Sequence, residues 1–572
     1  MAEVLLSPGV LARENDQTFI SAQPVQAGAA ILGPTVKGPV GIPTLVTSYS
    51  DYLNIFGAKV ESGSAEYTYL TSISAYNYFQ QGGDSLLVTR VVSGSFTPAT
   101  STPVSNSLDT NAFILETLTE GEIANSTSDE GTNNTLADGT KDNLRWEIAS
   151  ANTSSGTFSL LIRRGDDSSN QKVVLETWPN LSLDPNSDSY IEKVIGNAKQ
   201  NVVSDNGEYY LQYTGSYANA SRFVRVKSVG TPTLNYFDNN GTAKNALTGS
   251  IPVAASGTFG DATGANVPSG RAANYYNNIN NTDTQGLVAS DYTDSIKLLA
   301  NQDLFQYNII TAPGLIRDNA THTTEITRLV DNAQTRGDNL VVMDLVNYAA
   351  NIGTVTTEAS GVDSSYAATY WPWLQTIDPD LGSQVWVPAS TMMPGVFAFN
   401  DRAGEAWFAP AGLNRGGLST VIRAERNLTN GNRDTLYEAN INPIATFPNT
   451  GVVVFGQKTL QKKASSLDRV NVRRLLIELK SYISQIADNL VFEQNTIATR
   501  NNFLSQVNPY LASVQQRQGL YAFKVVMDES NNTPDVIDRN QLVGQIYIQP
   551  TRTAEFIYLD FNILPTGATF PA

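Results

Sequence analysis

The sequence contains no cysteine, and this absence excludes disulfide bonds, thiolate metal ligands and cysteine nucleophiles. It contains a single histidine, His322, so a histidine-dependent catalytic triad or metal site would rest on that residue alone. His322 lies near the start of a predicted amphipathic helix, where we expect it to be solvated or to cap the helix. The motifs G-x-x-x-x-G-K-S/T, G-x-S-x-G and H-E-x-x-H are also missing. The sequence therefore predicts a protein that is not an enzyme and that holds no cofactor and no metal ion.

Long apolar runs and positive charge are scarce as well. No apolar run approaches the roughly 18 residues that a membrane span needs, and the start, MAEVLLSPGV, lacks the features of a secretory signal. The 37 basic residues are outnumbered by 54 acidic ones, which gives a formal net charge of −17. A nucleic-acid-binding surface needs dense positive charge. We therefore expect a soluble globular protein that is made in a cytoplasm, binds no nucleic acid and does not insert into a membrane.

Strand and helix signals alternate in two separate parts of the chain, 21–95 and 301–545. In the first part, Ser50 is the predicted N-cap of a helix that ends at Gly57. In the second part, an apolar strand, a helix that ends at Gly337 and the strand NLVVMDLV follow one another. This order indicates parallel strands joined by a right-handed crossover. The sequence predicts a mixed α/β core whose two parts are separated along the chain.

Residues 96–300 differ from both flanking parts. Serine, threonine, asparagine, aspartate and glycine dominate, and short alternating runs such as TFSLLIRR predict strands. Residues 96–290 carry 12 basic and 20 acidic residues. Their net charge of −8 is about half of the net charge of the whole chain, −17. We expect a β-rich insertion with a solvated outer surface. It is either one unit or two small units that meet near 195–200.

The two ends of the chain resemble arms. Residues 1–20 combine a Pro-Gly turn with the short extended run Val10–Arg13, and they can bury little surface by themselves. Near the other end, two long helices precede the alternating stretch QLVGQIYIQPTRTAEFIYLDFNIL. This stretch predicts a terminal hairpin over Gln545–Ile563, and residues 546–572 are expected to form a C-terminal strand or arm.

Two further stretches have competing interpretations. DPNSDSYIE, from Asp184 to Glu192, has carboxylates at calcium-like spacing but lacks the glycine and the final glutamate of a calcium loop, so we favour a capped turn. The aromatic stretch YWPWLQTIDP, from Tyr370 to Pro379, suits either carbohydrate binding or core packing. We favour core packing.

Blocks such as SPGVLARE at the start, YFQQGGDSLLVTRV (78–91) and RVNVRRLLIELKSYI (469–483) occur in a fixed order along the chain. Together they resemble the contractile tail sheath proteins, a family that includes myophage tail sheaths and the sheaths of R-type pyocins and other contractile injection systems. SPGVLARE resembles their opening SPGVY-x-x-E, and YFQQGGDSLLVTRV resembles their block FF-x-NGG…V-x-RV. The chain departs from the family at FGQKTL (455–460), where W-G-A-R-T-L is usual, and at PAST (388–391), where PPSG is usual. The resemblance covers 1–95 and 305–572, and its further blocks are GPVGIPTLVTSYSDYLNIFG, IITAPGL, YWPWLQTIDP, VWVPASTMMPGVFAFND, AWFAPAG, INPIATFPNTGVVVFGQKTL, RVNVRRLLIELKSYI, VFEQNT and PTRTAEFIYLDF.

The resemblance implies a structural, force-generating function. Members of this family polymerise as stacked hexameric rings around a tail tube in an extended, metastable state. They contract to drive the tube through a cell envelope. The implied partners are further copies of the chain, the tube protein, and baseplate and tail terminator proteins at the ends. The implied location is a virion tail, or a phage-derived injection device, assembled in the host cytoplasm.

The resemblance also suggests which residues meet these partners. A helix of related sheaths faces an acidic tube, and this chain has a basic segment at the matching place. The expected tube-facing residues are Lys458, Lys462, Lys463, Arg469, Arg473, Arg474 and Lys480. We expect Arg473 and Arg474 to lie off the apolar stripe of the helix, although pairing with acidic neighbours in the same subunit is the alternative. The residues expected to exchange strands between subunits are Val10, Leu11, Ala12, Arg13, Glu14, Ile546, Ile548, Phe556 and Tyr558.

A second functional hypothesis places the function in 96–290. On that hypothesis the chain is a β-rich adhesin or carbohydrate-binding virion or surface protein. Electron microscopy separates the two hypotheses, because a sheath subunit forms rings or tubes and an adhesin of this kind remains as isolated particles.

Overall fold

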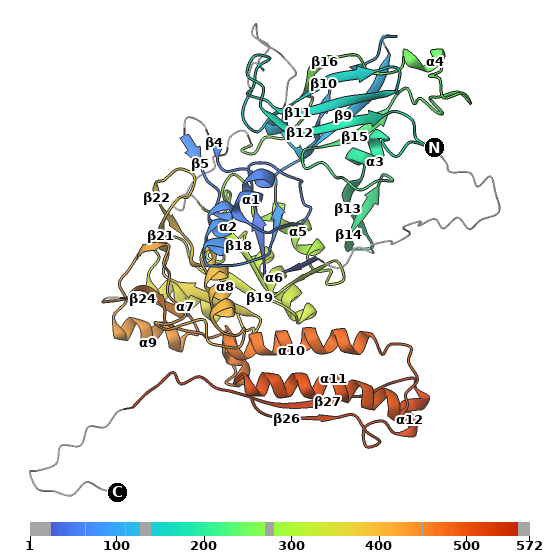
Figure 1. The fold of residues 1–572 in the computed structure, drawn as a ribbon. Helices are drawn as coiled ribbons and strands as arrows, with labels where there is room; N and C mark the ends of the chain where they lie inside the picture. The colour runs from blue at the N-terminus through green and yellow to red at the C-terminus, as the bar shows by residue number, and fades with distance from the viewer. Residues whose placement is uncertain are drawn as a thin grey trace, which may run out of the picture.

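A central mixed sheet organises the core of the molecule (Figure 1). The structure is a computed structural model, and it describes residues 25–62, 65–108, 110–125, 136, 139–268, 271, 279–448 and 450–558. The strands of the central sheet lie in the order β25-β24-β20-β19-β18-β2-β6-β3. Their bounds are β2 (Ala29–Gly33), β3 (Thr44–Val46), β6 (Leu86–Arg90), β18 (Ile309–Ile316), β19 (Leu340–Asp344), β20 (Ala367–Trp371), β24 (Asn442–Phe447) and β25 (Gly451–Val454).

The six inner strands of this sheet are parallel, and only the edge strands β3 and β25 are antiparallel to their neighbours. Strand β2 pairs with β18, so the early and late parts of the chain lie side by side. The predicted core, discontinuous in sequence, is therefore confirmed. The predicted strand–helix–strand order is present as β18, α6 (Thr323–Arg336) and the parallel strand β19.

Helices cover both faces of the central sheet, which explains why its strands are continuous apolar runs. Alternate residues of β2 face opposite layers: Ile31 joins the cluster of α1, α2 and α8, whereas Leu32 joins the cluster of α5, α6, α7 and α9. The bounds are α1 (Tyr49–Phe56), α2 (Leu70–Gln80), α5 (Thr293–Leu298), α6 (Thr323–Arg336), α7 (Ile352–Ser360), α8 (Met393–Ala403) and α9 (Asn430–Glu438).

The predicted helix ends are correct and one predicted start is shifted. Helix α1 ends at Gly57 and α6 ends at Gly337, which has a φ of 74°. The left-handed backbone at Gly337 suits glycine because it has no Cβ. The N-cap of α1 is Ser48 instead of Ser50, because the Ser48 hydroxyl accepts the N–H of Asp51 at 3.1 Å.

The insertion is one β unit built on a second large sheet, whose strands lie in the order β12-β11-β10-β16-β7-β9-β15, with β8 beside β9. Strands from before and after 195–200 share this sheet, and Ile195 packs in the same cluster as Val224. The alternative of two units that meet near 195–200 is therefore wrong. The bounds are β7 (Pro98–Ser101), β8 (Val104–Ser105), β9 (Asn111–Glu120), β10 (Leu144–Asn152), β11 (Thr157–Arg164), β12 (Val174–Ser182), β15 (Val224–Val229) and β16 (Ala255–Gly260).

The insertion ends earlier than residue 300. Leu287, Tyr292 and Ile296 are buried in the core cluster that contains α6 and the central sheet. We assign these residues to the core because the apolar side chains that they contact all belong to it. The predicted boundary at 300 therefore moves to about residue 280.

The insertion is fastened to the core by buried polar contacts. The fully buried Arg90, at the end of β6, donates to the carbonyl oxygens of Gly38 at 2.6 Å and Glu120 at 2.8 Å. Its other terminal nitrogen donates to Asn266 at 2.7 Å. Lys37 of the core forms an ion pair with Asp142 of the insertion at 2.8 Å. These contacts hold the insertion in one orientation at its base.

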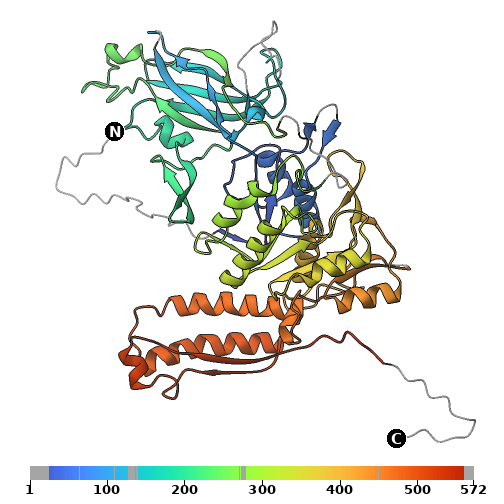
Figure 2. The same cartoon turned by 180° about the vertical axis from the view of Figure 1, so that it is seen from behind.

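The C-terminal part forms a third unit with its own apolar cluster. Helices α10 (Val470–Asp488) and α11 (Ile497–Gln516) lie side by side, and the ribbon of β26 (Leu520–Val526) and β27 (Gln545–Pro550) packs on α11 (Figures 1 and 2). The predicted hairpin within 545–563 does not form in its described part, because residues 551–558 form no strand; residues 559–563 lie outside the described residues. Strand β27 pairs antiparallel with β26, which lies upstream along the chain.

Shorter elements complete the fold. They are β1 (Val25–Ala27), β4 (Val60–Ser62), β5 (Ala65–Tyr67), α3 (Ile191–Ile195), β13 (Lys199–Asp205), β14 (Glu208–Thr214), α4 (Asn245–Thr248), β17 (Phe305–Tyr307), β21 (Leu374–Ile377), β22 (Gln384–Val387), β23 (Val421–Ala424) and α12 (Pro534–Asp538), with 3-10 turns at Glu122–Ala124, Ala289–Tyr292, Ala389–Thr391 and Ser466–Asp468. Within the described ranges, no helix combines the length and apolarity that a bilayer crossing requires.

Candidate partner-binding surfaces

Arg473 and Arg474 of the basic segment are buried, with exposed fractions of 4% and 3%. The expectation that both lie off the apolar stripe, where a tube could reach them, is therefore wrong. The helix has two buried sides: Leu475 and Leu479 pack toward α11, whereas Val470 and Ile477 join the apolar cluster of the core. The sequence pattern showed only one apolar stripe on this helix, whereas in the structure two of its sides are buried.

Arg474 joins α10 to α8. Its two terminal nitrogens donate to the two carboxylate oxygens of Asp401 at 2.8 and 2.5 Å. Its guanidinium also lies 4.8 Å from the ring centre of Phe397. A bidentate pair of this kind fixes both distance and angle. Arg474 therefore has the role that the sequence allowed as the alternative, pairing within the same subunit.

Arg473 binds the loop before β20. Its guanidinium lies 3.9 Å from the ring centre of Tyr366, and it donates to the hydroxyl of Ser365. Burial lowers the pKa of Arg473 from its ordinary value. Lys480 lies on the exposed side of the same tyrosine, with its amine 3.3 Å from the Tyr366 hydroxyl.

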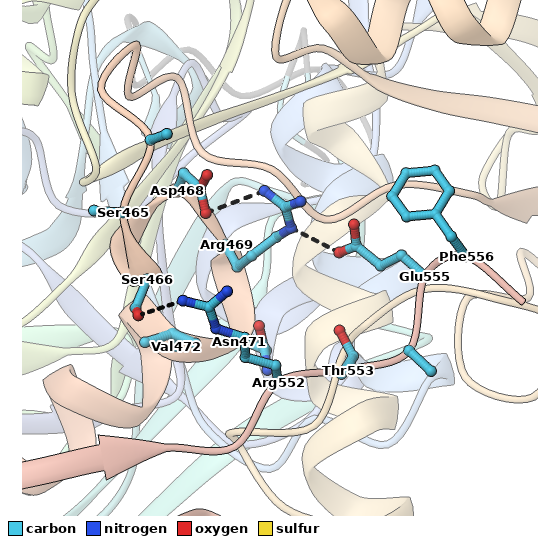
Figure 3. A pocket seen from close by; sticks show the side chains of 12 residues that line it. Ser465, Ser466, Asp468, Arg469, Asn471, Val472, Arg552, Thr553, Glu555 and Phe556 are labelled. Carbon is cyan, nitrogen blue, oxygen red and sulfur yellow. Dashed lines mark hydrogen bonds and ion pairs between the residues drawn. The ribbon is translucent and has the colours of Figure 1, made fainter.

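Lys458 and Arg469 are half-buried and also have partners within the chain. The amine of Lys458 donates to the carbonyl oxygen of Tyr437 at 2.7 Å, and desolvation lowers its pKa. The guanidinium of Arg469 pairs with Asp468 at 3.1 Å and with Glu555 at 2.7 Å (Figure 3). These two cations hold neighbouring segments of the same chain together.

Glu555 belongs to the segment after β27, which lies across the entrance of α10 (Figure 3). We call Thr551–Tyr558 the strap. A cavity of about 490 Å³ separates part of the strap from the loop that leads into the helix. Its lining is mainly polar and consists of Ala464, Ser465, Ser466, Asp468, Arg469, Asn471, Val472, Arg552, Thr553, Ala554, Glu555 and Phe556.

Three of the seven basic residues remain exposed: Lys462, Lys463 and Lys480. Lys462 and Lys463 lie in the loop between β25 and α10, whereas Lys480 lies in the middle of the helix. None of the three ammonium groups forms an ion pair with another described residue. The basic segment is therefore divided into four buried or half-buried residues that are held within the chain and three exposed ones, of which Lys480 also contacts the Tyr366 hydroxyl.

The expected strand-exchange residues fall into three groups. Val10, Leu11, Ala12, Arg13 and Glu14 lie outside the described residues. Ile546 and Ile548 lie on β27 and pack partly against the cluster of α10 and α11. Phe556 and Tyr558 lie on the strap with exposed fractions of 69% and 89%.

The ribbon itself leaves strand edges open. Strand β27 pairs with β26 along one edge, and their sheet has two strands, so among the described residues each strand has one edge without a strand partner. Such an edge presents unpaired N–H and C=O groups.

The other candidate sites have structural roles. His322 is 1% exposed, its Nδ1 accepts the N–H of Ile316 at 3.0 Å, and burial lowers its pKa to about 4. The expectation of a solvated histidine is wrong, because the chain folds back on the end of β18 at this turn. The alternative is correct in position, since His322 is the N-cap residue of α6, although its side chain makes no capping hydrogen bond. Trp371 and Trp373 are buried, which confirms core packing for the aromatic stretch. No group of three or more histidines or carboxylates in the described part of the chain is arranged to hold a metal ion.

Two family models match consecutive parts of the chain. The model described as the phage tail sheath protein central domain matches residues 285–460, and the one described as the phage tail sheath C-terminal domain matches residues 462–564. These ranges correspond to the second part of the core and to the C-terminal unit with the strap. Both models describe the same kind of protein, and they occur in the order that their names imply.

Curated relatives give the same result over part of the chain. A tail sheath protein of Vibrio phage KVP40 is 38% identical over 218 residues, which cover 38% of this chain and 32% of the relative. A tail sheath protein of Enterobacteria phage T4 is 36% identical over 245 residues, 43% of this chain and 35% of the relative. The chain thus matches about a third of the length of these relatives.

A solved structure extends the likeness of fold to most of the chain. The crystal structure of a sheath tail protein from Listeria innocua has a TM-score of 0.50 and 10% sequence identity to this chain. The alignment covers 92% of this chain and 96% of that protein.

Proposed function

This chain belongs to the contractile tail sheath protein family, and from that premise we propose that it is a structural subunit of such a sheath. The subunits polymerise as stacked hexameric rings around a tail tube and remain extended in a metastable state. They then contract and drive the tube through a cell envelope. The observation that carries this proposal is the consecutive match of a central and a C-terminal sheath domain over residues 285–564. The proposed location is a virion tail assembled in the host cytoplasm.

The proposed function needs no catalysis, cofactor or metal ion. The work of contraction comes from the difference in free energy between two arrangements of the same subunits. The proposed partners are further copies of this chain, the tube protein, and the baseplate and terminator proteins at the ends of the tail.

We assign the tube contact to the exposed lysines, Lys462, Lys463 and Lys480. Exposed ion pairs contribute only about 0–1 kcal/mol each. Many such pairs along a tube give a defined register, and each one still releases easily when the sheath moves outward. The four basic residues with internal partners, Lys458, Arg469, Arg473 and Arg474, support this surface by fixing α10 against the core and the strap.

We assign the connection between subunits to the arms. The open edges of the β26–β27 ribbon are proposed to accept an extended segment from a neighbouring copy, by main-chain hydrogen bonds. Residues 1–20 and the chain beyond the strap are the proposed donors. Unpaired edges would otherwise invite aggregation. A link of this kind stays intact while the compact parts of the subunits rotate relative to one another.

Negative-stain electron microscopy of the purified chain tests the proposed function. A sheath subunit forms rings or tubes. Isolated particles that never assemble, alone or with the tube protein, would contradict the proposal and favour a β-rich adhesin or carbohydrate-binding protein with its function in 96–290.

The tube contact has its own matched test. Lys462→Glu with Lys463→Glu is expected to abolish assembly on tubes, whereas the same change at the exposed Lys227 and Lys244 of the insertion is expected to have no effect. Both double variants change the net charge equally. Equal assembly of the two variants on tubes would rule out the lysine contact.

A further inference from the structure

The strap lies on the core with alternate side chains facing inward. Thr551, Thr553 and Glu555 are half-buried, whereas Arg552, Ala554 and Phe556 are exposed. This alternation is typical of an extended chain that has one face covered. Thr551 donates its N–H to the carbonyl oxygen of Gly519 at 3.2 Å. From residue 552 to 558 the backbone makes no hydrogen bond to another described residue, so side chains hold this part in place.

Glu555 makes most of these side-chain contacts. Its Oε1 accepts from the guanidinium of Arg469 at 2.7 Å and from the amide of Gln457 at 3.0 Å. Its Oε2 accepts from the hydroxyl of Tyr437 at 2.8 Å. The amide of Gln457 also donates to Thr553 at 2.5 Å. One carboxylate thus collects donors from α9, from the loop after β25 and from the entrance of α10.

The partners of Glu555 lead directly into the rigid part of the molecule. Arg469 is the N-cap residue of α10. Five residues further along the same helix, Arg474 is fixed to Asp401 of α8. Two charge-assisted contacts, connected by the first turns of α10, therefore link the strap to the core. Contacts of this type are shorter and stronger than neutral hydrogen bonds.

We propose that Glu555 is the positioning residue of the C-terminal arm. It holds the strap against the entrance of α10 and so sets the direction in which the chain leaves the subunit beyond residue 558. It also transmits the pull of a neighbouring subunit into α10 and the core. This inference rests on the proposed function, because a positioned arm matters only in a polymer. It also gives Arg469, which we expected from the sequence to face the tube, a role within the subunit.

The first test measures the position of the strap in the unassembled chain. Because the chain has no cysteine, Tyr558→Cys and Gln485→Cys introduce two spin labels without any background. Both positions are exposed, one at the end of the strap and one on α10. We expect one narrow distance distribution by double electron–electron resonance. In Glu555→Gln, which keeps the size of the side chain and removes its charge, we expect the narrow peak to be lost.

Asp468→Asn is the matched control. Asp468 also pairs with Arg469, at 3.1 Å, but it does not belong to the strap. The control is expected to keep the narrow peak, and the thermal unfolding of both variants is expected to match that of the parent chain. A narrow peak in Glu555→Gln would overturn the proposal, as would an equal loss of the peak in Asp468→Asn.

The second test measures the polymer. Sheaths of Glu555→Gln are expected to be shorter or broken, whereas those of Asp468→Asn are expected to be continuous. If Glu555→Gln releases the strap and still forms sheaths as long and regular as those of the parent chain, the positioning role is overturned. If the parent chain itself forms no sheath, the proposed function fails, and the spin-label result still decides whether Glu555 holds the strap.

Discussion

Replacing Arg474 by methionine should loosen α10 from the core without unfolding the rest of the chain. The substitution keeps the aliphatic stem and removes the two hydrogen bonds to Asp401. Hydrogen bonds to charged groups contribute about 1.5–3 kcal/mol, and the contact with Phe397 adds about 0.5–1 kcal/mol. The side chain of Asp401 is 37% exposed, so water can solvate it once its partner is gone. The lower and upper bounds of these two contributions add to about 2–4 kcal/mol, so we expect Arg474→Met to cost about 2–4 kcal/mol in local stability.

Removing the other partner of this pair, Asp401, should cost more local stability. Asp401→Ala leaves the Arg474 charge without its partner at a site where only 3% of its side chain is exposed. An orphaned buried charge costs about 3–5 kcal/mol. This asymmetry follows from burial alone, since both substitutions break the same pair.

Native-state hydrogen exchange of the α10 amides is the appropriate assay, because a chain with several units does not unfold in two states. A loss of about 2–4 kcal/mol corresponds to exchange that is roughly 30- to 900-fold faster. Lys480→Met is the control, because Lys480 is exposed on the same helix and its substitution should stay within about 0.5 kcal/mol. If Arg474→Met accelerates exchange no more than Lys480→Met, the pair with Asp401 contributes nothing and our description of α10 is refuted.

Three further predictions concern buried ionisable groups. The single His322 should titrate near pH 4, so its stabilising contribution is complete above about pH 6.5 and is lost as the pH falls toward 4; an NMR titration of histidine-labelled protein with its transition near 6.5 would contradict this. Burial raises the pKa of Asp344 to about 7, so the folded state keeps a proton that the unfolded state releases above about pH 3.8, and stability falls as the pH rises between these values. Asp344→Asn can still accept the N–H of Ser390. Its free energy of unfolding in urea should therefore fall less between pH 5 and 8 than that of the parent chain, and an equal fall in both would refute this prediction. Arg90→Met should raise exchange at the base of the insertion and leave α10 unaffected, because Arg90 donates to Gly38, Glu120 and Asn266; exchange that is unchanged in the insertion would contradict the proposed fastening.

The parts of the fold that depend on local sequence were predictable. Gly57 and Gly337 end helices because the backbone there has a positive φ, of 76° and 74°, which glycine adopts without steric cost, and glycine is visible in the sequence itself. The strand–helix–strand order from β18 to β19 follows from periodicity and from the handedness of crossovers. The two-sided burial of the central sheet follows from its continuous apolar strands.

The parts that depend on distant partners were not predictable from the sequence. Arg474 finds Asp401 73 residues earlier in the chain, and no local pattern marks that pair. Alternation in β27 indicates a strand but not its partner, so the pairing with β26 was missed. His322 has the surroundings of a helix start in sequence, and only the tertiary fold buries it. The family blocks indicated the kind of protein, and the division of the basic segment into internal and exposed residues required the structure.

The most direct measurement is cryo-electron microscopy of tails that carry this chain, in the extended and in the contracted state. Our account predicts that the subunits keep the same internal fold in both states. It also predicts that the β26–β27 ribbon of each subunit pairs with an extended segment from another copy before and after contraction. A ribbon whose open edges have no strand from a neighbour in either state would contradict the central claim that arms keep the sheath connected while it changes length.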